Sequence, residues 1–365
     1  MTETFLAISN HGSMIGGGEH AFLDLLGHLP TSWKPWAIVP KGGELFKRLS
    51  TNHVPALIIP LPSIRPWTIV SMITSLRTLL DAGQRAKSSF VYANGSRAAF
   101  YAGIAGRILQ IPVIWHCRIA EPDRYLDPIL TRLSSSIVVN SRATARRFKS
   151  KTSKKVKPVY NGVNIEWLKE ENIKRPREIQ KGWKAILVIA RVSRRKRHDI
   201  ALIAFEKVAT AEPNAHLFFL GRKDPRDKTW WDELQGRTFR SPFSERIHWI
   251  GEVEDVRPWL QSAFLLLSAS ENESFGRVLI EAMACAVPVI AARSGGVPEV
   301  VRDGQDGLLV TPGRPDEMAE AILKLLRNKP LRQKLVESGN ERAKLFSLDA
   351  HVKKMVEVFE ETIKR

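Results

Sequence analysis

Two carboxylates stand around the start of an expected helix in the stretch Ser268 to Glu281, which follows the apolar run FLLLS. Glu273 lies in the loop before that helix, and Glu281 lies about one and a half turns inside it, so both can face one cleft. Carboxylates placed there would accept hydrogen bonds from sugar hydroxyls. The alternative makes Glu273 a carboxylate that stabilises the helix dipole and Glu281 a surface residue.

The same helix start offers backbone amides to an anion. We expect the helix to open at about Phe275, so that the N–H groups of Ser274, Phe275 and Gly276 point out of its N-terminus. Gly276 has no side chain, which lets a ligand approach the backbone closely. A diphosphate fits such a site.

Cations gather where the strand AILVIA ends, because Arg191 follows that strand directly and Lys196 stands five residues later. Arginine offers a fixed fork of donors and lysine a mobile point charge. Together they could neutralise negative charge that grows on a departing nucleotide. A basic turn taken alone is more often a solvated loop, and its pairing with the acidic loop favours the ligand hypothesis.

Two features of the first half of the chain could also face a ligand. The run HGSMIGGGEHA places Gly17 and Gly18 before a helix expected to begin with Glu19. It departs from the dinucleotide fingerprint, since the glycines come about six residues after the strand and no acidic residue ends the next strand. The glycine loop could contact a phosphate or the acceptor, or it could be a purely structural turn. His116 closes the strand VIWH and could face a cleft, although a lone histidine is more often structural.

Alternating strands and helices must position these residues. Short apolar runs typical of buried parallel strands alternate with helix-length segments, which indicates doubly wound α/β domains. Ligands bind outside the carboxyl ends of such strands, where the candidate residues stand. The expected strands are 4–9, 37–40, 56–60, 90–94, 113–116, 137–140 and 156–160 in the first half, and 185–190, 216–220, 247–250, 264–268, 287–291 and 308–310 in the second.

The length of 365 residues favours about two domains. The polar stretch 166–184 carries charge and proline but no strand pattern, so we expect it to link a domain of residues 1–165 to one of residues 185–346. Residues 347–365 are expected to form a final helix after a Ser347 cap.

Composition excludes several classes of protein. The opening residues lack a signal-peptide pattern, and the apolar runs fall far short of the roughly 20 residues that span a bilayer. Cys117 and Cys285 are too few for a disulfide framework and are expected as free thiols. Because the sequence has no Asp-x-Asp pair, no helical histidine pair and no cysteine cluster, we expect no metal site.

The net charge of +18 is unevenly distributed, since residues 1–165 hold 21 Lys and Arg against 8 Asp and Glu. A basic half can attract nucleic acid, an anionic membrane leaflet or an anionic lipid-linked substrate. A merely solvated basic surface is the alternative. The tryptophans of this half, which could face a membrane or fill the core, are Trp33, Trp36, Trp67 and Trp115.

Taken together, these motifs resemble those of glycosyltransferase family 4, a retaining group with the GT-B fold. The resemblance covers nearly the whole chain and rests on GGGEHA, WHCR, IVVNSRAT, NGVN, ARVSRRKRHD, ENESFGRVLIEA and GGVPEVVRDGQDGLLV. It implies two Rossmann-like domains facing each other across a cleft, with acceptor on residues 1–165 and nucleotide-sugar on residues 185–346. It also implies that the last helix, 347–365, crosses back to the first domain.

The resemblance implies roles for the candidate residues. The diphosphate would lie on Arg191 and Lys196 and the ribose on Glu281. Many relatives follow the strand-end histidine with Asp, whereas this chain has Cys117. The implied donor-binding set is Gly17, Gly18, Arg191, Lys196, Glu273, Ser274, Phe275, Gly276 and Glu281, and the implied catalytic set is His116, Arg191, Lys196 and Glu273.

We therefore expect a retaining, metal-independent glycosyltransferase that moves a sugar from a nucleotide-diphosphate sugar, a UDP- or GDP-sugar, to a lipid-linked or polysaccharide hydroxyl. It needs no other cofactor. We place it in the cytoplasm, with peripheral binding to the anionic inner face of the membrane as a hypothesis. A GT-B sugar-nucleotide epimerase is one alternative. A basic nucleic-acid-binding protein is another, but no helix-turn-helix, zinc-finger or RNA-binding signature supports it, so we expect no nucleic acid partner.

Overall fold

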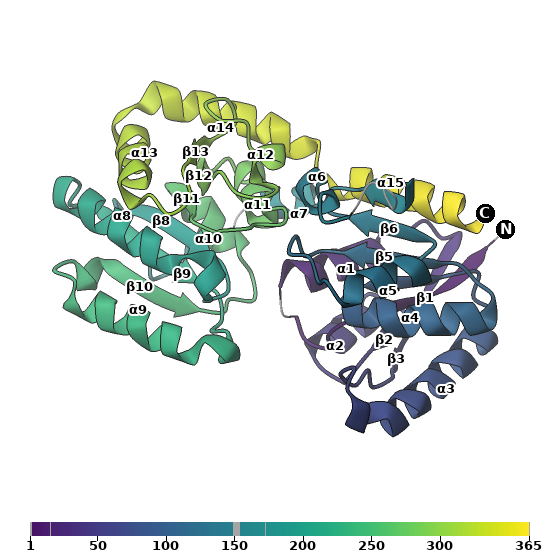
Figure 1. Ribbon diagram of the computed structural model, residues 1–365. Helices are drawn as coiled ribbons and strands as arrows, with labels where there is room; N and C mark the ends of the chain where they lie inside the picture. Colours follow the sequence, from purple (N-terminus) through teal and green to yellow (C-terminus); the bar gives the residue numbers. More distant parts are fainter. Residues whose placement is uncertain (1, 15, 149–153, 172, 365) are drawn as a thin grey trace. The chain divides into compact units, whose positions relative to one another are not determined.

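The computed structural model describes residues 2–14, 16–148, 154–171 and 173–364. The chain divides into two compact units, one of Met1–Val163 with Leu348–Arg365 and the other of Asn164–Ser347. Each unit is an α/β domain built on one parallel sheet (Figure 1). The doubly wound architecture that the alternating pattern predicts is therefore confirmed.

The first unit has seven strands in the order β3-β2-β1-β4-β5-β6-β7. Helices cover both faces, because the central strands are buried on both sides and need apolar cover on each. The strands are β1 (Glu3–Ser9), β2 (Trp33–Val39), β3 (Ala56–Ile58), β4 (Val91–Asn94), β5 (Val113–Cys117), β6 (Ser136–Val139) and β7 (Val156–Pro158). The helices are α1 (Gly17–Gly27), α2 (Glu44–Thr51), η1 (Pro66–Thr68), α3 (Ile69–Arg85), α4 (Ser96–Leu109), α5 (Leu126–Leu133), α6 (Arg142–Ala145) and α15 (Leu348–Ile363).

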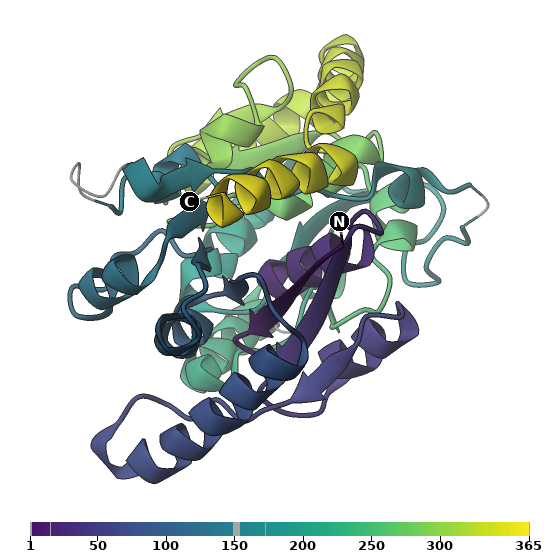
Figure 2. The ribbon, with the colours of Figure 1, turned by 90° about the vertical axis from the view of Figure 1, so that its right-hand side faces the viewer.

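The final helix α15 completes the core of the first unit. Its Phe359 is fully buried, with ring centroids 5.0 Å from Phe90 and 5.4 Å from Phe5. Thr362 and Ser136 share a buried hydrogen bond of 2.9 Å. Figures 1 and 2 both show α15 lying along this unit, so the expectation that the last helix crosses back to the first domain is confirmed.

The second unit has six parallel strands in the order β10-β9-β8-β11-β12-β13. They are β8 (Lys184–Ile189), β9 (Ala215–Leu220), β10 (Ile247–Gly251), β11 (Leu265–Ser268), β12 (Val289–Ala292) and β13 (Leu308–Val310). Each strand expected from the sequence is present. The helices are α7 (Ile165–Lys169), η3 (Arg194–Lys196), α8 (His198–Ala211), η4 (Pro225–Asp227), α9 (Lys228–Arg240), η5 (Ser244–Arg246), α10 (Arg257–Ser262), α11 (Arg277–Ala284), α12 (Val297–Val300), α13 (Pro315–Arg327) and α14 (Lys329–Lys344).

The stretch expected as a linker, 166–184, is part of the second unit. Its first residues belong to α7, in which Ile165 and Leu168 are buried. The carbonyl oxygen of Leu168 accepts a hydrogen bond from Gln261 Nε2 at 3.1 Å, which fixes the segment to α10. The polar composition concealed this helix, because Ile165 and Leu168, spaced three apart, are its only buried residues.

Both cysteines are free thiols, as expected. In the described parts of the chain, no helix is both long enough and apolar enough to cross a bilayer.

Candidate active site

An ion pair between Lys196 and Glu273 joins two loops of the second unit. Lys196 ends η3, which follows β8, and Glu273 lies in the loop after β11. Because β8 and β11 are neighbouring parallel strands, their carboxyl ends lie at the same edge of the sheet. Neither side chain is completely covered, so a ligand can reach both. The structure thus brings together the cation and the carboxylate that the sequence singled out.

Glu273 is held in its ionised form. Burial alone would raise the pKa of this carboxyl, but the ammonium of Lys196, the charge of Arg195 and the backbone N–H of Phe275 together keep the pKa below its ordinary value. At neutral pH the group is therefore a carboxylate, which can only accept hydrogen bonds. Hydroxyl groups of a sugar are suitable donors.

The loop amides differ from the sequence-based prediction. The N–H of Phe275 donates to the Glu273 carboxylate, and the Phe275 ring is buried against Phe346 with ring centroids 5.9 Å apart. Helix α11 begins at Arg277, with Gly276 at its N-cap in a left-handed conformation of φ 94°. The prediction that the amides of Ser274, Phe275 and Gly276 all point outward is therefore wrong for Phe275, whose N–H orients Glu273 instead.

Arg191 has a carboxylate partner that the sequence did not reveal. Its Nε lies 3.3 Å from Asp224, which also pairs with Arg226 at 2.8 Å. Hydrogen bonds from Arg226 and the charge of Arg191 hold the pKa of Asp224 well below its ordinary value. A single carboxylate thus orients two arginines.

Arg191 and Glu273 are both influenced by the charge of Arg195. Burial lowers the pKa of Arg191, Asp224 opposes this, and the charges of Arg226, Arg195 and Arg222 lower it further. The charge of Arg195 also lowers the pKa of Glu273. We call this set the basic cluster, and it consists of Arg191, Arg195, Lys196, Arg222 and Arg226. The cluster gathers five cations around Asp224 and Glu273, an arrangement that can attract an anion.

Glu281 is placed on α11, as expected, but it has a partner. Its Oε1 accepts from Arg277 Nε at 2.8 Å, one turn earlier on the same helix. Both side chains are largely covered. To bind a ribose, Glu281 would therefore have to accept a hydrogen bond from a ribose hydroxyl in addition to the one from Arg277.

A turn that contains Gly295 and Gly296 contacts the backbone of the Glu273 loop. The N–H of Gly296 donates to the Glu273 carbonyl oxygen at 2.7 Å, and Gly295 adopts φ 55°. A Cβ atom at Gly295 would lie 2.0 Å from that same oxygen, closer than any side chain can be. This explains the two glycines of the GGVPEV motif, to which the sequence alone gave no role.

His116 does not face an open edge, and that expectation is corrected. The side chain is fully buried, and its Nδ1 lies 2.7 Å from the hydroxyl of Tyr92 and 3.3 Å from Nη2 of Arg118. Burial and the charges of Arg118 and His351 hold its pKa well below the ordinary value, so the imidazole is neutral. The strand-end position was predicted, but Tyr92 and Arg118 cover it.

Arg118 is the residue that sequence reasoning missed in the first unit. Its Nε donates to Asn94 at 2.5 Å and its Nη1 to Asn161 at 2.6 Å. Asn94 in turn donates to the Gly18 carbonyl oxygen at 3.2 Å. Arg118 belongs to the WHCR motif and Asn161 to the NGVN motif, and membership in these two motifs is the feature of the sequence that could have pointed to them.

Gly17 and Gly18 lie in the first turn of α1, which begins at Gly17 and not at Glu19. Glu19 accepts from the N–H of Gly16 at 3.1 Å and so caps the helix. A Cβ atom at Gly18 would lie 3.2 Å from Cδ of Arg118. Gly18 therefore allows the arginine to pack close to the backbone, which is a structural reason for a glycine there.

Two protein-family models match the chain. A model described as Glycosyltransferase Family 4 matches residues 15–167, and one described as Glycosyl transferases group 1 matches residues 169–342. Together they leave only the two ends and residue 168 unmatched. The chain belongs to glycosyltransferase family 4.

Relatives of this glycosyltransferase include named enzymes. It is 29% identical to the N-acetyl-alpha-D-glucosaminyl L-malate synthase of Bacillus anthracis, over 58% of this chain and 54% of the relative. It is 32% identical to a lipopolysaccharide core biosynthesis glycosyltransferase of Rhizobium meliloti, over 35% and 36%. The chain thus spans about half or less of the length of the curated relatives it matches.

The fold of this glycosyltransferase has solved counterparts. The crystal structure of Anabaena HepE in complex with UDP-glucose is similar with a TM-score of 0.84, at 20% identity, over 98% of this chain and 99% of that chain. This likeness confirms the GT-B fold, two Rossmann-like domains. The curated relatives cited above are glycosyl-transferring enzymes by name.

The support from the glycine turn can be tested by Gly295→Ala. We expect a loss of about 1–3 kcal/mol in unfolding free energy, because the methyl group cannot fit and a left-handed conformation strains any other residue. Transfer activity should fall at least tenfold, since the Glu273 loop must move. Denaturant unfolding and steady-state kinetics measure both.

The matched control is Gly304→Ala. Gly304 also has a positive φ, of 69°, but no atom beyond Gly304 and its two chain neighbours lies within 4 Å of the position its Cβ would take. This variant should lose stability without losing activity. Equal losses of activity in the two variants would contradict the supporting role of Gly295.

Proposed function

We propose that this glycosyltransferase moves a sugar from a nucleotide-diphosphate sugar to a hydroxyl group of a glycan or lipid-linked acceptor, retaining the anomeric configuration and using no metal ion. The observation that carries the proposal is the basic cluster beside the Lys196–Glu273 pair. It offers fixed cations for a diphosphate and a carboxylate for a sugar on one sheet edge.

Charge stabilisation would be the main catalytic work. As the bond between sugar and diphosphate breaks, negative charge grows on the leaving phosphate oxygens. Lys196 has three N–H donors, so it can keep one on Glu273 and direct others to a phosphate. Arg191, oriented by Asp224, adds a fixed fork. These cations supply the neutralisation that a divalent ion gives in other transferases, which supports a metal-independent reaction.

The position of Glu273 supports a same-face route with retention. The carboxylate already holds Lys196 and the N–H of Phe275, so it is poorly suited to attack the anomeric carbon. It would instead accept a hydrogen bond from a hydroxyl of the donor sugar and so orient the ring. The acceptor hydroxyl would then attack on the face from which the diphosphate leaves, and a phosphate oxygen would take its proton.

The relatives supply the first substrates to try. The bound UDP-glucose of Anabaena HepE favours a UDP-sugar as donor, with GDP-sugars next. The lipopolysaccharide enzyme of Rhizobium meliloti favours a glycan or lipid-linked acceptor.

Lys196→Ala tests the proposed charge stabilisation. We expect kcat to fall about 100- to 1,000-fold, because the lysine would act on charge that develops in the transition state. Lys207→Ala is the matched control, since Lys207 belongs to the same unit and pairs with Asp316 on the surface. That variant should stay within about twofold of the unchanged protein. A Lys196→Ala enzyme with near-normal kcat would refute the role.

Product analysis tests the reaction type. UDP- and GDP-sugars are incubated with and without acceptor glycans, and proton NMR follows the anomeric signals. We expect a retained anomeric configuration in the product and the same rate in EDTA. Activity abolished by EDTA and restored by a divalent ion would contradict metal independence. An isomerised nucleotide-sugar formed without acceptor would instead indicate an epimerase.

We also propose that the first unit binds an anionic membrane surface through the segment 64–73, which includes the start of α3. Trp33 and Trp115 are buried in the core, whereas Trp67 is 76% exposed. The guanidinium of Arg65 lies 5.3 Å from the centre of the Trp67 ring. Apolar side chains next to a cation suit an interface with anionic lipid. The exposed apolar residues are Ile64, Trp67, Ile69, Val70 and Ile73.

Val70→Asp tests membrane binding. We expect about tenfold weaker co-sedimentation with vesicles of phosphatidylglycerol, because one apolar side chain no longer leaves water. Ile108→Asp changes another exposed apolar residue of the first unit, on α4, and should bind as before. Binding of the unchanged protein that is equally weak on neutral vesicles and insensitive to salt would count against the hypothesis.

A further inference from the structure

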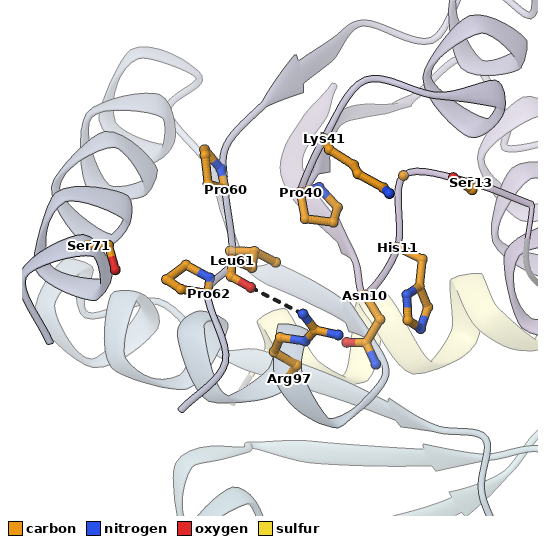
Figure 3. Close-up of a pocket in the computed structure, with 11 residues that line it drawn as sticks. Asn10, His11, Ser13, Pro40, Lys41, Pro60, Leu61, Pro62, Ser71 and Arg97 are labelled. Carbon is orange, nitrogen blue, oxygen red and sulfur yellow. Dashed lines mark hydrogen bonds between the residues drawn. The ribbon is translucent and has the colours of Figure 1, made fainter. Parts of the chain in front are cut away.

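A pocket of about 450 Å3 lies within the first unit, at the carboxyl ends of its strands. It collects the residues that follow β1, β2 and β3 together with Arg97 from the first turn of α4 (Figure 3). Lys41 enters from the loop after β2. All of the lining residues belong to the first unit, whereas the basic cluster belongs to the second.

The charge of this pocket is uncompensated. Lys41 and Arg97 line it, and none of the lining residues carries a carboxylate. In the part of the chain that the structure describes, neither cation forms an ion pair with a carboxylate. Most arginines of the basic cluster's unit do have acidic partners, as Arg226 does with Asp224. Two cations without acids at a concave site favour an anionic ligand.

Arg97 is held in position by the backbone. One of its terminal nitrogens donates to the carbonyl oxygen of Leu61 at 3.3 Å, and the hydroxyl of Tyr101 donates to the next carbonyl, that of Pro62, at 2.8 Å. Figure 3 shows the guanidinium between the Leu61 carbonyl and the Asn10 side chain. A tether at one nitrogen fixes the plane and leaves the other donors for a ligand.

The wall beside Arg97 is also well ordered. Asn10 Oδ1 accepts from the N–H of Ala98 at 2.8 Å, which caps α4 beside the pocket. Gly95 has φ 108°, and a Cβ atom there would lie 2.3 Å from Asn10 Nδ2, so only glycine permits this approach. The positive end of the α4 dipole adds to the field of the two cations. Three prolines in the lining add apolar surface to the pocket.

We propose that this pocket binds the anionic group, a phosphate or a carboxylate, of the acceptor substrate. The inference rests on the proposed function, the transfer of a sugar to an acceptor hydroxyl, and places that acceptor on the first unit. Arg97 would form a charge-assisted pair with the oxyanion and Lys41 would add a second donor. The apolar wall would contact the carbon skeleton of the acceptor. Neutral acceptors would lack the main source of affinity.

Binding is measured by titration calorimetry with excess UDP present, so that the donor site does not contribute. Glucose 6-phosphate is the soluble probe, glucose its neutral control, and vesicles with phosphatidic acid test a lipid source. We expect saturable binding of at least one phosphate probe and none of glucose. Arg97→Gln should weaken that binding about 10- to 100-fold, because a hydrogen bond to a charged group is lost. Lys41→Gln, at an exposed position, is a second variant and should weaken it less.

Arg107→Gln is the matched control, since Arg107 lies farther along α4 outside the pocket and should leave binding unchanged. Binding of both phosphate probes that is unaffected by Arg97→Gln and Lys41→Gln, or that is absent in the unchanged protein, overturns the inference. UDP binding and sugar transfer by the unchanged protein are followed separately. If the unchanged protein binds UDP and transfers sugar while the phosphate probes give one of these overturning results, only the pocket assignment fails. If no transfer occurs with any acceptor, the proposed function fails.

Discussion

The salt bridge between Lys196 and Glu273 exists because parallel strands end at the same edge of a sheet. The cation comes from the loop after β8 and the carboxylate from the loop after its neighbour β11. The next strand, β12, leads to the glycine turn whose Gly296 holds the carbonyl of Glu273. Three adjacent strands thus supply the charge, its partner and the support. The arrangement depends more on strand order than on any single loop.

The same constraint organises the first unit. The loop after β1 provides Asn10, the loop after β2 provides Lys41, and β5 leads directly to Arg118. Arg118 joins Asn94 and Asn161 and fixes the start of α1 through Gly18. Both units therefore place several polar side chains at the carboxyl edge of the sheet. In the second unit these groups include cations with acidic partners, whereas the residues that line the pocket of the first unit include Lys41 and Arg97 and no carboxylate.

Sequence reasoning located elements better than side-chain directions. The strands were predictable because a strand buried on both faces must be apolar throughout, as AILVIA is. The approach of Lys196 to Glu273 followed from their positions at strand ends. The burial of His116 did not, because Tyr92 and Arg118 come from elsewhere in the fold to cover it. The pairing of Arg191 with Asp224 likewise links strands β8 and β9 through space, and local spacing carries no sign of it.

Helix α15 has a consequence for how the protein forms during translation. The core of the first unit includes Phe359, packed on Phe5 and Phe90, so its aromatic centre is incomplete until residues 348–363 leave the ribosome. Domains usually fold in the order in which they are synthesised. Here the second unit, a continuous segment, can finish first. The first unit must wait with part of its aromatic surface exposed, which makes it the half that most needs protection by chaperones.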